Sequence, residues 1–331
     1  MKDAIVFHHN HCFDAVAAAV CAADYLENIE GWKIKKFEPV TYTTDDSWIQ
    51  RDLPEYSAVL DFLYQPKAKF WVDHHGTTFA PNHPELEEHY KEGLKDPSRT
   101  LIYDKSYPSG AGLLWEHIKD FVTDRPRYEE MVRWANITDT ATYDTPYQAV
   151  FGDEPALRIA STLGSKDPEH IEKLIQALRT GTIEEVATLP SIEKHFLESR
   201  PKIEMGLKEI TKRLEINEEK DIMVYETKDQ ENVSLPRFGP FLIRPDITYM
   251  ISLVHGEKGS KISASRNPWG RETKAALGTI FREYGGGGHH GVGSLQLPPG
   301  NVEKSREMLR GVIASIRKSE SEHLQNTGQN R

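Results

Sequence analysis

Acidic side chains and histidines follow short apolar runs at three places in the first half of the sequence. The segment 8–14 (HHNHCFD), Asp61 and the triplet 73–75 (DHH) each come directly after such a run, and Asp139 lies near the end of a predicted helix. In an open parallel sheet, ligands bind beyond the carboxyl ends of the strands. We therefore expect these side chains to converge on one edge of a sheet.

A group of carboxylates and imidazoles suits hard or borderline divalent ions, and one carboxylate can bridge two of them. Two ions about 3.5–4 Å apart polarise a phosphoryl group and lower the pKa of a bound water. The pattern therefore favours hydrolysis of a phosphate ester. A single aspartate after a strand is usually a helix cap or a turn residue. The interpretation depends on all four segments occurring together in this order.

The order of the predicted elements indicates a two-domain α/β protein. In the first half, short apolar runs alternate with helical stretches, which is typical of βαβ units and a parallel sheet. An alanine-rich helix over 14–26 has side chains small enough to pack closely on that sheet. The predicted strands of this half are 4–7, 58–62, 70–72 and 100–103.

The second half has its own pattern of strands and helices. A charged amphipathic stretch over 191–214 separates the two halves and predicts an interdomain helix. Beyond it, the predicted strands are 221–225, 248–254, 261–265 and 292–297, with helices over 274–284 and 302–317. We predict an N-terminal parallel-sheet domain (1–190), a helical linker (191–217), a smaller C-terminal α/β domain (218–318) and a disordered polar tail (319–331).

The composition narrows the classes of partner. The 331 residues suffice for two domains, and the formal charge of −10 argues against a broad surface for long duplex nucleic acid. A small anionic ligand in a local pocket is compatible with that charge. No apolar run approaches the roughly 20 residues of a membrane-spanning helix, and the N-terminus has no signal-peptide core, so we expect a cytoplasmic protein. The two cysteines, Cys12 and Cys21, are too few for a disulfide framework.

Several spacings match one family. The triplet 73–75 follows Asp61 by a short interval, and His8 lies six residues before Asp14. Further segments with characteristic residues are 109–116 (SGAGLLWE), 137–140 (ITDT) and 285–293 (GGGGHHGVG). In these features the chain resembles the DHH phosphoesterase superfamily, which includes RecJ-like exonucleases, nanoRNases, cyclic-dinucleotide phosphodiesterases and inorganic polyphosphatases. The last segment resembles the signature of the C-terminal domain associated with that family.

The resemblance implies a centre of two divalent metal ions, most simply Mn²⁺. Asp61 would bridge the two ions. One site would be completed by Asp14, His74 and Asp139, and His8 would belong to the other.

The resemblance also implies residues that act on the substrate. Asp73 would orient His74, and His75 would face the phosphate. In the C-terminal domain, Arg266 can contact a phosphate with two nitrogens, and a glycine run lets backbone N–H groups approach an anion closely. The predicted substrate-binding residues are therefore Arg266, Gly286, Gly287, Gly288 and His289. A flexible loop is the alternative interpretation of the glycine run.

The chain departs from the family pattern at Cys12. The first family motif usually has an aspartate two residues before the position of Asp14, and Cys12 stands there. A thiolate prefers softer ions than Mn²⁺, so Cys12 would weaken the first metal site, recruit Zn²⁺ or Fe²⁺, or not ligate at all. The extra histidines His9 and His11 leave the choice of ligand in this loop open, with His9 second to His8.

We therefore predict a metal-dependent phosphoesterase whose centre lies in a cleft between the two domains. The expected substrates are short oligoribonucleotides, linear or cyclic dinucleotides, or nucleoside bisphosphates. One alternative is an inorganic polyphosphatase. The other is a catalytically weakened nucleotide-binding protein in which Cys12 has disabled the centre. We predict neither long duplex nucleic acid nor a membrane as a partner, and the sequence leaves an oligomer open.

Overall fold

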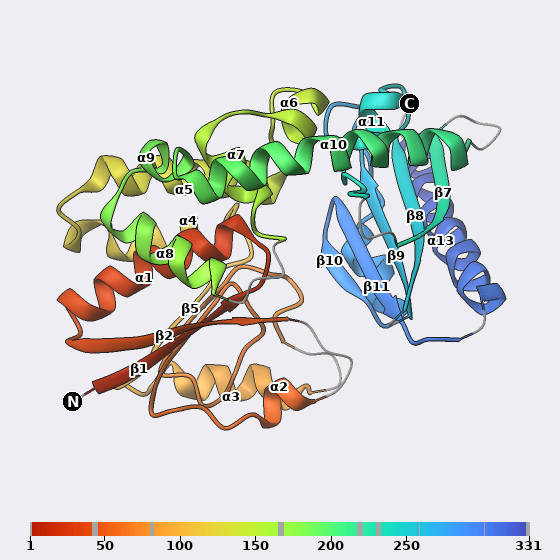
Figure 1. Cartoon of the computed structure of the whole chain (residues 1–331). Helices are drawn as coiled ribbons and strands as arrows, with labels where there is room; N and C mark the ends of the chain where they lie inside the picture. The colour runs from red at the N-terminus through yellow and green to blue at the C-terminus, as the bar shows by residue number, and fades with distance from the viewer. Residues whose placement is uncertain are drawn as a thin grey trace. The chain divides into compact units, whose positions relative to one another are not determined.

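The computed structural model describes residues 2–41, 46–79, 83–164, 169–216, 221–229, 233–257, 259–300 and 302–328. The chain forms two compact units (Figure 1). The first unit comprises Met1–Thr142 and Asp153–Phe196, and the second comprises Tyr143–Gly152 and Leu197–Arg331.

The first unit contains a five-stranded, entirely parallel sheet with the order β2-β1-β3-β4-β5. Its strands are β1 (Lys2–His9), β2 (Trp32–Val40), β3 (Tyr56–Leu60), β4 (Phe70–Asp73) and β5 (Thr100–Tyr103). Strand β2 is not among the strands predicted from the sequence. This strand lies at the edge of the sheet and exposes several lysines, so it lacks the continuous apolar run of a strand buried on both faces.

Helices cover both faces of this sheet. They are α1 (Phe13–Asn28), α2 (Ser47–Gln50), α3 (Glu85–Gly93), α4 (Gly110–Ile118), α5 (Arg125–Thr140), α7 (Pro155–Ser161), α8 (His170–Thr180) and α9 (Ile183–Ala187), with a 3₁₀ turn at Lys119–Phe121. The alanine-rich helix α1 is buried on nearly every side, because its small side chains let α4, α5 and α8 pack against it. Alternate residues of the strands point to opposite faces of the sheet and belong to two hydrophobic cores. The core on the α1 face contains Val6, Leu60 and Val72, and the core on the α3 face contains Phe7, Val59 and Trp71.

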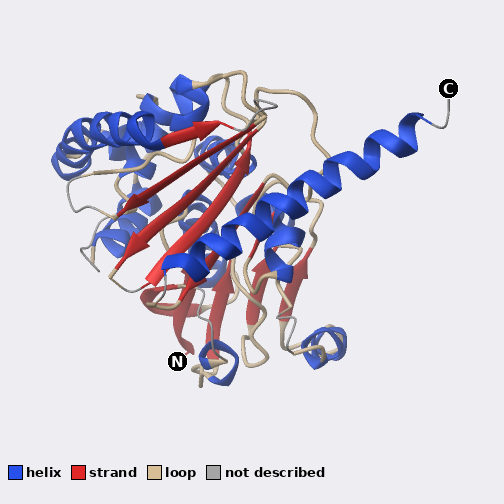
Figure 2. Ribbon diagram, turned by 90° about the vertical axis from the view of Figure 1, so that its right-hand side faces the viewer, coloured by secondary structure: helices blue, strands red, loops and turns tan. Residues whose placement is uncertain are grey.

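The second unit contains a six-stranded mixed sheet with the order β10-β11-β9-β8-β7-β6. Its strands are β6 (Leu214–Ile216), β7 (Ile222–Lys228), β8 (Tyr249–Gly256), β9 (Gly259–Arg266), β10 (Gly287–His289) and β11 (Val292–Leu297). Only the β7–β8 pairing is parallel within this sheet's described strands. The helices are α6 (Pro146–Phe151), α11 (Gly239–Ile243), α12 (Leu277–Glu283) and α13 (Val302–Gly328), together with the larger part of α10 (Pro190–Arg213). Figure 2 shows α13 lying across one face of this sheet.

The segment Tyr143–Gly152 belongs to the second unit, although the sequence analysis had placed it within 1–190. The indole Nε1 of Trp269 donates a hydrogen bond to the backbone oxygen of Tyr143 at 2.8 Å. The rings of Tyr143 and Phe238 pack edge to face at 5.6 Å, and the guanidinium of Arg200 lies over Phe151. These contacts join residues that are about 50 to 130 positions apart, so local sequence patterns do not reveal them.

The structure corrects the prediction that the chain is disordered from residue 319 onwards. Helix α13 continues through Ser319 and ends at Gly328. The carboxylate of Glu320 accepts hydrogen bonds from the Tyr249 hydroxyl at 2.7 Å and from the backbone N–H groups of Lys274 and Ala275 at 2.7 and 2.9 Å. A polar composition is typical of disorder, but Glu320 ties this stretch to the second unit. The remaining tail residues, 329–331, lie outside the described ranges.

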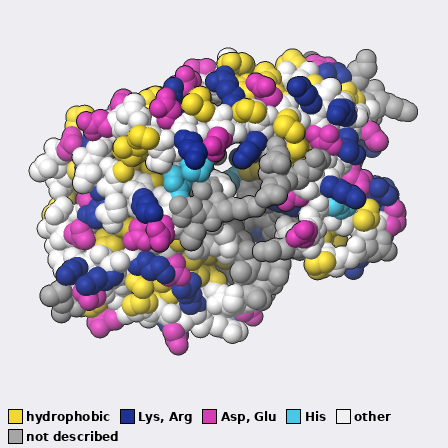
Figure 3. Space-filling view, viewed as in Figure 1, with side chains coloured by type: hydrophobic (Ala, Val, Ile, Leu, Met, Phe, Trp, Pro, Cys, Tyr) yellow, Lys and Arg dark blue, Asp and Glu magenta, His cyan; other side chains and the backbone are white. Residues whose placement is uncertain are grey.

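The surface has no extended patch of a single charge on the face seen in Figure 3, where basic and acidic side chains of the described residues are interspersed on each unit. The chain's formal charge is −10. Over the described ranges, none of the helices is both long and apolar enough to cross a membrane.

Candidate metal centre

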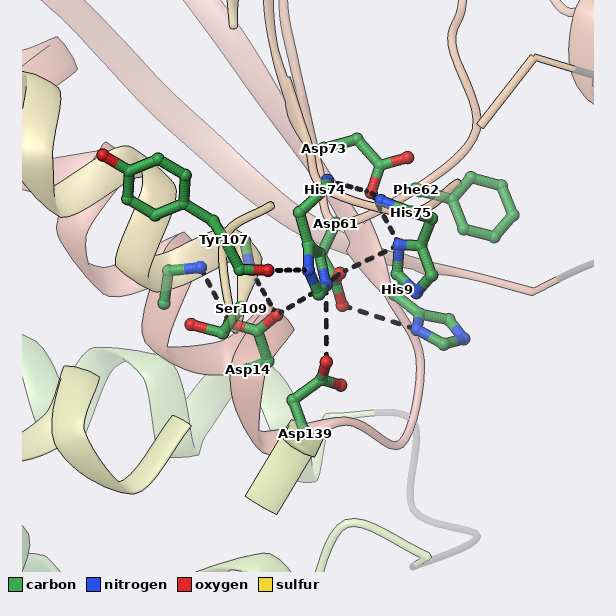
Figure 4. A network of polar contacts seen from close by, with 12 residues as sticks. His9, Asp14, Asp61, Phe62, Asp73, His74, His75, Tyr107, Ser109 and Asp139 are labelled. Carbon is green, nitrogen blue, oxygen red and sulfur yellow. Dashed lines mark hydrogen bonds and ion pairs between the residues drawn. The ribbon is translucent and has the colours of Figure 1, made fainter. Parts of the chain in front are cut away.

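The predicted acids and histidines converge in the first unit, at the carboxyl ends of its central strands (Figure 4). His9 ends β1, Asp61 follows β3, and the triplet 73–75 begins at the end of β4. Asp14 lies in the first turn of α1 and Asp139 in the last turn of α5. Because the strands are parallel, their carboxyl ends share one edge, and α1 and α5 bring two further carboxylates to the same place.

The imidazole of His74 lies at the middle of three carboxylates. Its Nε2 atom is 3.4 Å from Asp139 Oδ2, 3.6 Å from Asp61 Oδ1 and 3.7 Å from Asp14 Oδ2. On the other side of the ring, Nδ1 lies 3.1 Å from the backbone oxygen of Tyr107. A hydrogen bond from Nδ1–H to this carbonyl would place the lone pair of a neutral His74 on Nε2, facing the carboxylates.

Asp14 is held in place by the first turn of α4. Its two oxygens accept hydrogen bonds from the backbone N–H groups of Gly110 and Ala111, each at 2.7 Å. A Cβ atom at Gly110 would lie 3.4 Å from atoms of both Asp14 and Asp61, so the start of the helix packs in van der Waals contact with the two acids. Ser109 caps the helix by accepting from the Gly112 N–H at 2.8 Å. The role of the segment 109–116 in positioning Asp14 was not predicted, although a serine at the N-cap position followed by small residues indicates a helix start.

Asp61 occupies the centre of the cluster in an unusual backbone conformation. Its φ angle of 54° is left-handed, which is uncommon outside glycine and best tolerated by Asn and Asp. The side chain is 1% exposed, and neither oxygen accepts a hydrogen bond from the residues that the structure describes. Oδ2 lies 3.5 Å from His9 Nδ1, whereas Oδ1 lies 3.6 Å from His74 Nε2. The two oxygens therefore face different imidazoles.

A second group consists of His9, Cys12 and Asp61, whose ligand atoms all lie within 4.8 Å of one another. His8 was the predicted ligand at this position, with His9 second. The structure places His9 beside Asp61, and His8 is in neither group. Adjacent residues of a strand point to opposite faces, so only one of the two histidines can face Asp61 directly. The Nε2 atom of His8 is nevertheless buried with no hydrogen-bond partner among the described residues.

The third histidine of the loop, His11, is engaged elsewhere. Its Nδ1 atom contacts the backbone oxygen of Leu163, and its Nε2 atom lies 3.0 Å from the side-chain nitrogen of Asn10. His11 is thus outside both groups.

Asp73 orients a different residue from the one predicted. Its Oδ1 atom lies 2.7 Å from His75 Nδ1 and accepts from the backbone N–H of His74 at 2.9 Å. The prediction that Asp73 orients the ring of His74 is therefore not what the structure shows, since the Tyr107 carbonyl does so. The carboxylate folds back over the turn that follows β4, which brings it to the ring two residues later.

Charge explains the pKa shifts in the cluster. Burial lowers the pKa of His74, but Asp61, Asp14 and Asp139 outweigh it and raise the pKa to about 10. Burial is likewise outweighed at His75, where Asp73 and Asp61 raise the pKa to about 9. Burial and the charges of Asp61 and Asp139 raise the pKa of Asp14 well above its usual value. The centre thus concentrates negative charge that a bound cation would neutralise.

The donor atoms fit divalent metal ions. Two atoms that bind one ion at about 2.0–2.2 Å lie about 3–3.5 Å apart at tetrahedral or octahedral angles. The nitrogen–oxygen separations of 3.4–3.7 Å around His74 are near this range and longer than ordinary hydrogen bonds. Two groups of ligand atoms share the buried carboxylate of Asp61. The residues therefore fit a divalent metal ion better than they fit a hydrogen-bonded network.

The predicted substrate-binding residues lie in the second unit and have a local packing role as well. Gly287–His289 forms the edge strand β10 instead of a loose loop. A Cβ atom at Gly286 or Gly288 would lie 2.3 Å from a carbonyl oxygen of β11, so close backbone packing alone requires these glycines. Arg266 ends β9, and a Cβ atom at Gly291 would lie 2.8 Å from its Nε atom. Gly291 therefore leaves room for the Arg266 side chain.

Solved structures resemble nearly the whole chain. The pGpG-specific phosphodiesterase PggH from Vibrio cholerae is 19% identical, with a TM-score of 0.65, over 96% of this chain and 100% of that chain. An exopolyphosphatase-related protein from Bacteroides fragilis is 12% identical, with a TM-score of 0.53, over 97% and 93% of the two chains. RecJ from Thermus thermophilus, in complex with Mn²⁺, is 13% identical, with a TM-score of 0.52, over 96% and 52%. No protein-family model and no curated protein sequence matches the chain.

These likenesses confirm the α/β fold class that the sequence predicted. Together they show that the chain shares the fold of these phosphodiesterase, exopolyphosphatase-related and RecJ structures. At identities of 12–19% the likeness concerns the fold, so the activity is argued from the residues of the site.

Proposed function

We propose that this protein is a hydrolase of the DHH type, a metal-dependent phosphoesterase that cleaves phosphate ester bonds of short nucleotides. The observation that carries the proposal is the environment of Asp61. Its carboxylate is buried, accepts no hydrogen bond from the described residues, and directs its two oxygens towards different imidazoles. Burying an ionised carboxylate is costly, and the imidazole nitrogens lie 3.5–3.6 Å from its oxygens, which is longer than an ordinary hydrogen bond, so that two cations would supply closer partners.

The residues divide into two ligand sets around Asp61. Asp14, His74 and Asp139 would hold one ion, and His9 with Cys12 would hold the other, with His8 as the alternative histidine. When bound, two divalent ions such as Mn²⁺ polarise a phosphoryl group and supply a water of lowered pKa. The backbone N–H groups of α4 and the Tyr107 carbonyl keep Asp14 and His74 in ligating positions.

His75 is the residue that we assign to the phosphate. The carboxylate of Asp73 lies 2.7 Å from its Nδ1 atom, which fixes the orientation of the ring and keeps Nδ1 protonated. In the metal-free site, Asp73 and Asp61 outweigh burial and raise the pKa of the imidazole to about 9. A charged imidazole donates a hydrogen bond from Nε2–H to a phosphate oxygen and stabilises the charge that develops there during hydrolysis.

We propose further that Arg266, Gly286, Gly287, Gly288 and His289 bind the anionic end of the nucleotide. The edge strand β10 carries three of these residues, and an edge strand presents backbone groups that its neighbour does not use. Arg266 lies at the end of β9, and its side chain packs against Gly291. PggH, of similar fold, is described as specific for pGpG, which is a short nucleotide of the proposed class.

A substrate screen tests this proposal. The purified protein, loaded with Mn²⁺, is incubated with short RNAs, cyclic dinucleotides, 3′,5′-bisphosphates and inorganic polyphosphate, and with an Asp61→Asn variant as the inactive control. We expect release of phosphate or mononucleotide from at least one nucleotide and no release by the variant. Hydrolysis of polyphosphate alone would reassign the protein as a polyphosphatase. Binding of nucleotides without any turnover would identify a nucleotide-binding protein instead.

A further inference from the structure

We propose that Cys12 is a thiolate ligand, so that the His9, Cys12 and Asp61 group forms a site selective for thiophilic divalent ions such as Zn²⁺, Co²⁺ or Fe²⁺. The group of Asp14, His74 and Asp139 keeps a ligand set rich in oxygen, which suits Mn²⁺ or Mg²⁺. The centre would then hold two different ions. This inference rests on the metal centre of the proposed function, but it concerns the identity of the ions and not the reaction.

The first observation is geometric. His9 comes from the end of β1, Cys12 is the N-cap residue of α1, and Asp61 follows β3. Their ligand atoms lie within 4.8 Å of one another although Asp61 is about 50 residues away in the sequence. The strand and the helix place the sulfur on the side of the loop that faces the carboxylate. A cysteine whose role was only to fill the core would have apolar neighbours there.

The second observation is independent of the cysteine. Asp61 is 1% exposed, and its Oδ2 atom, which faces His9, accepts no hydrogen bond from the described residues. A buried carboxylate oxygen in this state requires a cation or a donor. The Cys12 thiol is only a weak hydrogen-bond donor. A cation between the sulfur and the carboxylate satisfies both groups.

The chemistry of the donors decides which ion is preferred. One sulfur, one imidazole nitrogen and one carboxylate oxygen form a mixed set that favours Zn²⁺, Co²⁺ or Fe²⁺ over Mn²⁺. The N-cap position adds to this preference, because the first N–H groups of the 16-residue helix α1 favour an anionic thiolate beside them. Two carboxylates and one imidazole in the neighbouring group have no such preference for a soft ion.

The chain contains its own control. Cys21 lies in the same helix, is fully buried, and belongs to the apolar core between α1 and its neighbouring helices. It is the only other cysteine in the sequence. Any spectral or chemical signal of a metal-bound thiolate must therefore come from Cys12 if it survives replacement of Cys21.

The experiment is a Co²⁺ titration of the metal-free, full-length protein, followed by near-ultraviolet absorption. Sulfur-to-cobalt charge transfer gives a band that oxygen and nitrogen ligands do not give. We expect the band in the wild type and in Cys21→Ala, and its loss in Cys12→Ser and Cys12→Asp. In a competition between Zn²⁺ and Mn²⁺, the ratio of Zn²⁺ affinity to Mn²⁺ affinity should be at least tenfold lower in Cys12→Asp than in the wild type.

A second measurement uses the wild-type protein, so its result does not depend on whether the variants fold. Alkylation by iodoacetamide, mapped by mass spectrometry, should be slowed at least tenfold at Cys12 by stoichiometric Zn²⁺. A charge-transfer band that persists in Cys12→Ser would overturn the inference, as would Zn²⁺ binding without the band and without protection of Cys12. Because no substrate is involved, a protein that shows the band but hydrolyses no ester would refute the proposed function and leave this inference intact.

Discussion

Replacing Asp61 with asparagine should abolish the shared metal site while preserving the fold. The change keeps the shape of the side chain, and asparagine tolerates the left-handed φ of 54° as well as aspartate does. It removes the negative charge that both ligand groups share. The amide offers one neutral oxygen and one NH₂ group, so one group of ligands faces a hydrogen-bond donor in place of an oxygen. Both ions are therefore affected by a single substitution.

The expected magnitude follows from the position of each oxygen. Oδ1 lies with His74 and Oδ2 with His9, so each ion loses a direct, charged ligand. Altering a residue that merely orients a ligand costs about 10–100-fold in metal affinity, so loss of the ligand should cost at least about 100-fold for each ion. At a Mn²⁺ concentration of about 100 times the dissociation constant, one ion stabilises the folded protein by about 2.7 kcal/mol. For the variant, that stabilisation falls to about 0.4 kcal/mol.

The assay combines metal content and thermal unfolding. The wild type, Asp61→Asn and Asp52→Asn are stripped of metal, reloaded and analysed by mass spectrometry and by calorimetry with and without Mn²⁺. Asp52 is the matched control, because it is an exposed aspartate whose partner is the surface Lys67. We expect two ions and a Mn²⁺-dependent rise in melting temperature for the wild type and the control. An Asp61→Asn protein with the same metal content and the same rise would refute the bridging role.

Three other predictions concern single residues. Arg266→Ala or His289→Ala should raise KM for short nucleotides while leaving metal content and turnover of a small generic ester unchanged; equal losses on both substrates would contradict the assignment. His9→Ala should remove more bound metal than His8→Ala, and the reverse order would return the ligand role to His8. Glu320→Gln should lower the free energy of unfolding of the second unit by about 1–2 kcal/mol at neutral pH, after discounting for solvent. Because the folded pKa of Glu320 is about 2 against an ordinary 4.5, its contribution is present above pH 4.5 and is lost as the pH falls towards 2, so wild type and variant should converge in acid-unfolding experiments.

Sequence patterns predicted the sheet of the first unit because its central strands are apolar on both faces. Strands β3 and β4 read as short runs of Val, Leu and aromatic residues between polar segments. The polar residue that follows such a run must lie at the carboxyl edge of the sheet. Asp61 and the triplet 73–75 were therefore expected to converge before any contact was known.

Other elements depended on partners that are distant in the sequence. The edge strand β2 is too polar to be read as a strand, and it forms because β1 supplies hydrogen bonds along its length. The part of α13 around Glu320 is polar, and Glu320 is bound there by Tyr249 and Arg271. The segment Tyr143–Gly152 joins the second unit through Trp269. In each case the stabilising group lies far from the element that it stabilises, so a local pattern does not contain it.

The sequence by itself determined the kinds of ligand at the centre and the order of the strands that deliver them, since residue type and spacing are properties of the chain alone. Only the tertiary structure decided which side chains meet. In the structure His9 lies beside Asp61, and the ring of His75 contacts the carboxylate of Asp73. The ring of His74 contacts the backbone oxygen of Tyr107. These choices depend on rotations of side chains and on turns of backbone over a few ångströms. Neighbouring histidines have the same chemistry and nearly the same position in the sequence, so a motif does not distinguish between them. Their side chains point in different directions once the strand ends and the loop turns.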